Sequence, residues 1–234
     1  MKKTVLLTLV CMSATLPALA QTKFDDRLGT SAEVLRQLTA RTDAIPKDIL
    51  DKAVCVMVYP NVKKVGVGLG VTYGRGVLTC RTGPHMQGTW SAPAMYTMDV
   101  GSLGVQLGTS STDYVLLVMS QQGADKVLAG GLKLGADATA VAGPTGAKAV
   151  GHNDVNADIY TYSRAKGGLF AGTSLGTASM KSDDTANKSL YGKPVDVQQI
   201  VRDGAVSTPA SGEALIAVLE KNTPGQEESA KKHK

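Results

Sequence analysis

Apolar residues recur at helical spacing near the start of the chain. The positions that make up this stripe are Phe24, Leu28, Leu35, Leu38, Ile45 and Ile49. Pro46 suits the first turn of a helix, so the pattern predicts two helices, over residues 30–42 and 46–53. Such a stripe either packs on a sheet or, with the arginines beside it, lies in a membrane surface as an amphipathic helix.

The periodicity changes to that of strands at residue 54. Residues 54–59 are rich in β-forming side chains and are followed by Pro60 and Asn61, which predicts a strand and a turn. Similar segments follow at 64–73, 76–82, 94–100, 103–108 and 113–119, between breaks that contain Gly, Pro or Asp. Such short spacings favour hairpins, so we expect a largely antiparallel sheet.

The second half of the chain alternates short helices and strands. The pattern predicts a helix at 121–129, followed by glycine-rich strands up to 150. Further strands are predicted at 159–162 and from 169 to 180. A helix at 185–191 and a last helix, which Thr208 caps and Pro209 opens, complete the predicted fold. The predicted fold class is α+β, a largely antiparallel glycine-rich β-sheet or barrel-like sandwich with N- and C-terminal helices packed on it.

The first twenty residues have the pattern of a secretory signal. Lys2 and Lys3 precede an apolar run over 5–12, and Ala18 and Ala20 form an A-x-A cleavage site. We therefore expect cleavage after Ala20 and a periplasmic or secreted protein that associates peripherally with membranes. Lipid attachment at Cys11 is the alternative, although Val10 stands where a small residue is normally required.

The expected organisation is a signal peptide at 1–20, a lead at 21–29, one domain at 30–222 and a disordered tail at 223–234. Without the two signal lysines, 25 − 2 = 23 basic residues face 20 acidic ones, a net charge of +3. This mild charge permits an anionic partner, while nucleic acid is not expected because no basic run alternates with aromatic residues. Cys55 and Cys80 are the cysteines that remain, and the sequence leaves open whether they form a disulfide or stay as buried thiols.

Motifs of catalysis and cofactor binding are missing from the sequence. The glycines between 66 and 76 do not have G-x-G-x-x-G spacing, and no phosphate loop follows them. His85, His152 and His233 all lie in predicted turns or the tail, and no G-x-S-x-G motif accompanies them. We therefore expect no catalytic residues, no metal and no cofactor.

Several cations lie at predicted turns or strand ends, where they can reach phosphate oxygens. These candidates for lipid binding are Lys63, Lys64, Arg75, Arg81, Arg164 and Lys166.

Three groups of segments together resemble the SYLF domain. They are 53–60 (AVCVMVYP) with the glycine-rich 66–76; 90–94 (WSAPA) with 104–108 (GVQLG); and 160–163 (YTYS), 168–172 (GLFAG) and 187–191 (NKSLY). The resemblance covers residues 30–220 and implies non-enzymatic binding of anionic phospholipid with phosphoinositide-like head groups.

Some eukaryotic members of the SYLF family bind actin, which an exported protein would not normally meet, so actin is not expected as a partner. Two rival functions remain open. One is an envelope structural or stress protein that binds a protein or glycan, and the other is a hydrolase.

Overall fold

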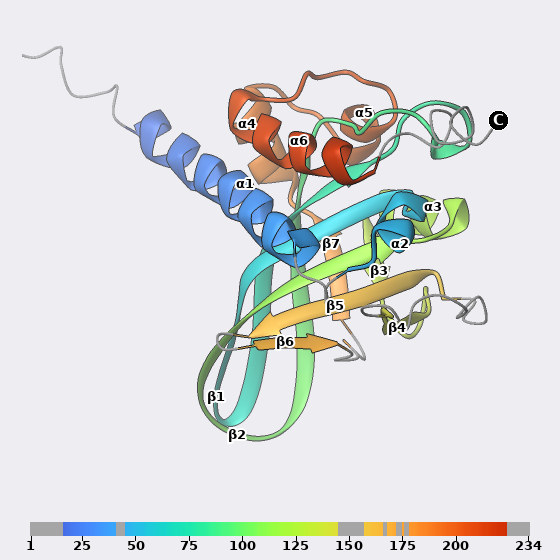
Figure 1. The fold of residues 1–234 in the computed structure, drawn as a ribbon. Helices are drawn as coiled ribbons and strands as arrows, with labels where there is room; N and C mark the ends of the chain where they lie inside the picture. The colour runs from blue at the N-terminus through green and yellow to red at the C-terminus, as the bar shows by residue number, and fades with distance from the viewer. Residues whose placement is uncertain are drawn as a thin grey trace, which may run out of the picture.

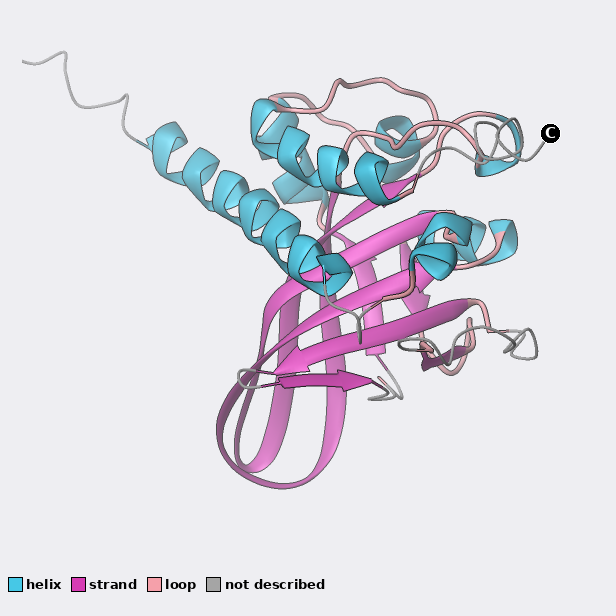
Figure 2. Ribbon diagram, in the orientation of Figure 1, coloured by secondary structure: helices cyan, strands magenta, loops and turns pink. Residues whose placement is uncertain are grey.

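The computed structural model of the protein describes residues 16–40, 45–144, 157–165, 168–171, 175 and 178–223. A curled sheet of seven strands carries helices along one side and at one end (Figures 1 and 2). The helices are α1 (Leu16–Ala40), α2 (Lys47–Lys52), α3 (Gln121–Leu128), α4 (Asp184–Tyr191), α5 (Val197–Val201) and α6 (Glu213–Asn222). The strands are β1 (Cys55–Cys80), β2 (Ala94–Val118), β3 (Gly131–Lys133), β4 (Ala140–Ala142), β5 (Ile159–Ala165), β6 (Gly168–Ala171) and β7 (Ala178–Ser182). The predicted α+β class is confirmed.

Two long strands form the frame of the sheet. β1 has 26 residues and β2 has 25, and they pair antiparallel along almost their whole length. The prediction of several short strands joined by hairpins was therefore wrong for residues 54–119. The breaks predicted at Pro60–Asn61 and at Gly74 lie inside β1, where a glycine without a Cβ lets the strand bend.

This two-stranded ribbon folds back on itself. A Cβ placed on Gly76 would lie 2.4 Å from the carbonyl oxygen of Val58, so only glycine allows the two halves of β1 to approach this closely. The backbone amide of Arg81 donates to the carbonyl of Val54 at 2.8 Å. The two ends of β1 therefore meet, although 25 residues separate Cys55 from Cys80.

Cys55 and Cys80 form a disulfide at this meeting point. Their Cα atoms lie 3.9 Å apart, and both side chains are fully buried. The structure thus answers the question of pairing that the sequence left open.

The remaining strands extend the ribbon. The sheet order is β3-β7-β2-β5-β4, with β1 paired to β2 and β6 paired to β5. All of these pairs are antiparallel except β4 with β5. The strand predicted to run from 169 to 180 is instead two strands, β6 and β7, which pair with different partners.

The sheet buries both of its faces. On one face Val56 and Val58 pack in a cluster that includes residues of α1, α2 and α6. On the other face Met57 and Tyr59 pack in a cluster that includes residues of α3 and α5. Burial on both sides explains why residues 54–59 form a continuous apolar run rather than an alternating one.

The first helix differs from its prediction in a way that bears on function. α1 begins at Leu16 rather than near residue 30, and its residues Leu28, Leu35 and Leu38 are fully buried. The apolar stripe therefore packs on the core. Of the two interpretations of the stripe, packing on the sheet is confirmed. Over residues 23–40, whose side chains the structure describes, the stripe is thus used for packing and is not free to enter a membrane.

The shorter helices follow local signals. α3 and α4 confirm the predicted helices at 121–129 and 185–191. α5 was missed, although Asp196 and Gln199 form a capping box at its start. Thr208 does not cap the last helix. Pro209 is the N-cap of a short 3-10 helix, Ala210–Gly212, and Gly212 is the N-cap of α6.

Candidate functional site

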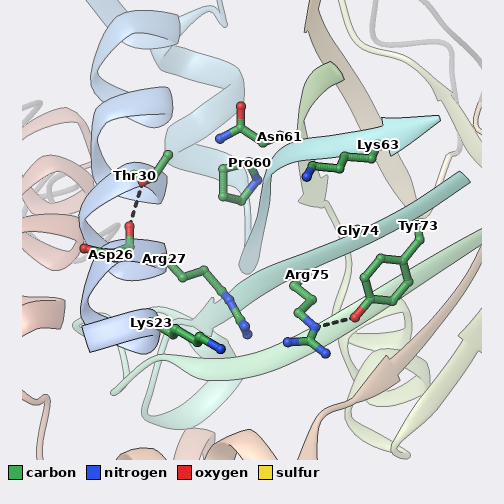
Figure 3. A pocket seen from close by; sticks show the side chains of 10 residues that line it. All are labelled: Lys23, Asp26, Arg27, Thr30, Pro60, Asn61, Lys63, Tyr73, Gly74 and Arg75. Atoms are coloured by element: carbon green, nitrogen blue, oxygen red, sulfur yellow. Dashed lines mark hydrogen bonds between the residues drawn. The ribbon is translucent and has the colours of Figure 1, made fainter. Parts of the chain in front are cut away.

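A pocket of about 370 Å³ lies between the first half of α1 and the folded-back β1. Its lining residues are Lys23, Asp26, Arg27, Thr30, Pro60, Asn61, Lys63, Tyr73, Gly74 and Arg75 (Figure 3). Four of these residues are cationic and one is acidic. The surplus of positive charge gives the pocket a positive potential, which attracts anions.

The helix contributes Lys23 and Arg27, which lie one turn apart on the same face. The guanidinium of Arg27 is half-buried, donates to the sulfur of Met95 at 3.4 Å, and stands 5.8 Å from the ring centre of Phe24. Burial is the main cause that lowers the pKa of Arg27; the negative charge of Asp183 opposes this shift, and the positive charge of Arg75 adds to it. An anion bound between the two arginines would relieve their repulsion.

The strand contributes Lys63, Tyr73 and Arg75. Tyr73 and Arg75 share a face of β1 because strand side chains alternate, and Arg75 Nε donates a hydrogen bond to the Tyr73 hydroxyl. This hydrogen bond is the main cause that raises the pKa of Arg75. Figure 3 shows Arg27 and Arg75 extending from opposite walls toward one another.

Gly74 lets the two halves of β1 approach each other at the strand wall of the pocket. A Cβ at this position would lie 2.7 Å from Cγ2 of Val62, on the other half of β1. The bend of the ribbon therefore brings Lys63 and Arg75 to the same pocket, although eleven residues of chain lie between them. This proximity could not be read from the local pattern of the sequence.

The predicted lipid-binding cations divide into separate groups. Lys63 and Arg75 line the pocket, whereas Lys64 is half-buried and does not. Arg164 is engaged elsewhere, in an ion pair with Asp113 at 2.6 Å. Lys166 lies outside the described residues.

Arg81 is not a surface cation. Its side chain is 1% exposed, its Nη2 lies 3.2 Å from a carboxylate oxygen of Asp51, and its guanidinium stacks 4.8 Å from the centre of the Trp90 ring. Burial lowers the pKa of Arg81, which Asp51 opposes. The prediction that Arg81 reaches lipid from a turn is therefore corrected, because Asp51, Trp90 and Thr223 enclose its side chain.

Arg27, Lys23 and Tyr73 were missed as site residues. Lys23 and Arg27 stand at i and i+4 in a helical pattern, which is the signal that could have placed them on one face. Tyr73 and Arg75 stand at i and i+2 in a strand, which is the corresponding signal there. The sequence offered no indication that these two faces oppose each other.

The rest of the described chain offers little alternative chemistry. His85 is exposed in a turn with φ of 57°, and His152 and His233 lie outside the described residues. Among the residues that the structure describes, no group of three or more His, Cys, Asp or Glu side chains could hold a metal ion. A second pocket, of about 510 Å³, has Asp184, Asp196 and Asp203 as its charged lining residues, so it repels anions. Nor does the described part of the chain contain a helix long and apolar enough to cross a membrane.

Comparison with known proteins gives a consistent family match. A family model described as "Las17-binding protein actin regulator", Ysc84, matches residues 99–222. An SH3 domain-containing protein of Schizosaccharomyces pombe is 31% identical over 79% of this chain and 43% of its own length. The "LAS seventeen-binding protein 3" of Saccharomyces cerevisiae is 29% identical over 79% of this chain and 40% of its own.

A mammalian relative covers a similar part of the chain. The "SH3 domain-containing YSC84-like protein 1" of Bos taurus is 28% identical over 82% of this chain and 58% of its own length. The chain thus spans less than half of the two yeast relatives and somewhat more than half of the bovine one. The family description and the names of these relatives refer to binding and regulatory proteins.

Proposed function

Because this chain belongs to the Ysc84 family, whose domain is the SYLF domain, we propose that it is a non-enzymatic domain that binds anionic phospholipid head groups at a membrane surface. The observation that carries the proposal is the pocket between α1 and β1, where Lys23, Arg27, Lys63 and Arg75 surround a space of about 370 Å³. Guanidinium groups bind phosphate through two parallel hydrogen bonds, and lysines add mobile positive charge.

The pocket suits reversible attachment rather than permanent anchoring. A cation close to an anionic membrane surface contributes about 1 kcal/mol. Four such cations, opposed by Asp26, give an affinity that falls as salt screens the charges. The proposed attachment is therefore weak and sensitive to ionic strength.

Export is part of the proposal. Cleavage after Ala20 would remove the first residues of α1 and leave Lys23 and Arg27 in the remaining helix. The site would then face lipids in the periplasm or outside the cell. We expect mass spectrometry of the protein from its native host to give a mature chain that begins at Gln21. A chain that begins at Met1, or one with a lipid on Cys11, would contradict this expectation.

Lys63 and Lys64 offer a matched pair of variants that tests the pocket itself. Replacing Lys63 with glutamate removes one pocket cation and adds an anion, which should weaken binding to anionic vesicles by about 2 kcal/mol, or roughly 30-fold. Lys64→Glu changes the net charge equally but alters a side chain outside the pocket. We expect a several-fold smaller loss from Lys64→Glu. Vesicle sedimentation at low salt measures both.

The outcomes separate three cases. Equal losses from Lys63→Glu and Lys64→Glu would mean that diffuse surface charge, and not the pocket, determines binding. If the unaltered protein bound no anionic vesicle at low salt, the lipid function itself would be wrong. Circular dichroism of each variant verifies that folding is intact, since surface substitutions usually cost within about 0.5 kcal/mol.

A protein partner is the second candidate. The names of the family model and of one yeast relative describe those proteins as Las17-binding, which favours a protein-binding surface on the shared domain. For an exported chain the corresponding partner would be a protein or glycan of the envelope. Capture of a defined partner that neither high salt nor Lys63→Glu diminishes would favour this candidate over lipid.

A further inference from the structure

The β1–β2 ribbon folds back on itself at the middle of both strands, and this bend, which forms one end of the molecule (Figure 1), differs in composition from the rest of the sheet. We use the term ribbon end for residues 65–71 of β1 and 101–109 of β2. Residues 65–71 consist of valine, leucine and glycine, and neither segment contains a charged residue. The two segments pair with each other, with Val67 opposite Leu107 and Val71 opposite Gly101.

The ribbon end extends away from the helices (Figure 1). β5 pairs with β2 over residues 112–118, and β7 pairs with β2 over residues 96–100. Between these stretches β2 has β1 as its one partner within the described chain. The ribbon end is therefore a two-stranded projection that no other described strand covers.

Polar and cationic residues border the ribbon end where it joins the sheet. On β1, exposed Lys63 and half-buried Lys64 precede it, and exposed Arg75 follows it. Tyr73, between them, is 39% exposed and is the one large hydrophobic residue with such exposure among those described. Tyrosine with neighbouring basic residues is typical of the boundary between lipid head groups and acyl chains.

We propose that the ribbon end enters the interface of an anionic bilayer while the adjacent pocket binds a lipid head group. This inference rests on the proposed function and names the part of the chain that inserts. Two observations favour a bilayer as the occupant. The exposed cations at the base of the ribbon end also line the anion pocket, and the apolar face of α1 is already buried in the core.

The geometry also limits the depth of insertion. The outer edges of the ribbon end have backbone N–H and C=O groups that pair with no other described strand. Unpaired backbone groups are strongly disfavoured in hydrocarbon, so these edges must remain within reach of water. The ribbon end therefore lies in the head-group region and upper acyl chains and does not cross the membrane.

A tryptophan introduced into the ribbon end tests the inference directly. The chain has one natural tryptophan, Trp90, which is 6% exposed and donates to Thr223 at 2.8 Å, so its emission provides a constant background. When the Leu107→Trp variant binds vesicles of phosphatidylglycerol with brominated acyl chains, we expect the fluorescence of the new tryptophan to shift to shorter wavelength. We also expect the bromine atoms to quench this fluorescence. Bromine near the head group should quench more strongly than bromine near the chain ends. The matched control is Ala217→Trp on the exposed side of α6, which should show neither change.

A charge variant supplies an independent measurement. Leu107→Glu should lower the affinity for the same vesicles about tenfold, which corresponds to losing the burial of one leucine-sized side chain. Thermal melting verifies that each variant is folded. If Leu107→Trp did not fold, Leu103→Trp would serve as the probe on the same segment.

The results distinguish this inference from the function on which it rests. If the unaltered protein bound vesicles, but Leu107→Trp was not quenched and Leu107→Glu bound normally, the insertion of the ribbon end would be overturned and head-group binding would stand. Equal quenching of Ala217→Trp would also overturn it, because α6 lies at the opposite end of the molecule (Figure 1). If the unaltered protein bound no vesicle, both proposals would fall.

Discussion

Replacing Arg81 with alanine is expected to lower the free energy of unfolding by about 3 kcal/mol, the lower end of the range for breaking a buried ion pair, because Asp51 is 26% exposed and water can reach it. The guanidinium donates to the Asp51 carboxylate at 3.2 Å and to the backbone carbonyls of Ala53 and Gly88 at 3.3 Å each. It also donates to the carbonyl of Thr223 at 3.4 Å. Alanine would leave these acceptors unpaired and would open a cavity beside Trp90.

Urea unfolding followed by circular dichroism measures this loss. Arg81→Lys is the matched control, because lysine keeps the charge but lacks the planar fork that reaches several acceptors at once. We expect it to recover part of the loss. A change below about 1 kcal/mol for Arg81→Ala would contradict the prediction, since it would mean that water replaces the guanidinium at little cost.

Replacing Cys55 and Cys80 together with alanine is expected to cost about 3 to 4 kcal/mol, the chain-entropy value for a closed loop of this length. The sequence separation is 25, and the closed loop contains nearly all of β1. The hydrogen bonds beside the disulfide remain in the variant, including Arg81 N to Val54 O and Ser91 N to Cys80 O at 2.8 Å each. The loss should therefore arise mainly from a less restricted unfolded chain.

The midpoint of urea unfolding should fall for this double variant, while the near-ultraviolet spectrum of the folded protein stays close to that of the parent. Unfolding the parent with and without a thiol reductant provides the second comparison. The reduced parent should match the double variant within about 1 kcal/mol, since both lack the same constraint. An oxidised parent no more stable than the reduced one would contradict the prediction.

These two predictions separate folding from function. Arg81 was a candidate for lipid binding in the sequence, but its buried position assigns it to stability. Loss of vesicle binding in Arg81→Ala would therefore follow from unfolding. Lys63→Glu, on an exposed residue of the pocket, should weaken binding and leave the unfolding midpoint unchanged.

The sequence by itself determined the local elements and the kinds of chemistry available. Helices α3 and α4 lie where their periodicity and caps predicted them, and residues 54–59 form a buried strand, because these signals depend on neighbours within a few residues. The mild positive charge permitted an anionic partner, and the resemblance to the SYLF domain implied anionic phospholipid, because charge, residue type and local motifs need no fold to be read.

Only the tertiary structure decided which residues act together. The bend of β1 joins Cys55 to Cys80, places Lys63 rather than Lys64 in the pocket, and buries Arg81. Glycine is equally consistent with a strand break and with a bent strand, so the local pattern could not distinguish several hairpins from one long ribbon. The opposition of α1 and β1 is a long-range contact that helical or strand periodicity does not encode. The site therefore exists only once the ribbon has folded back beneath the helix.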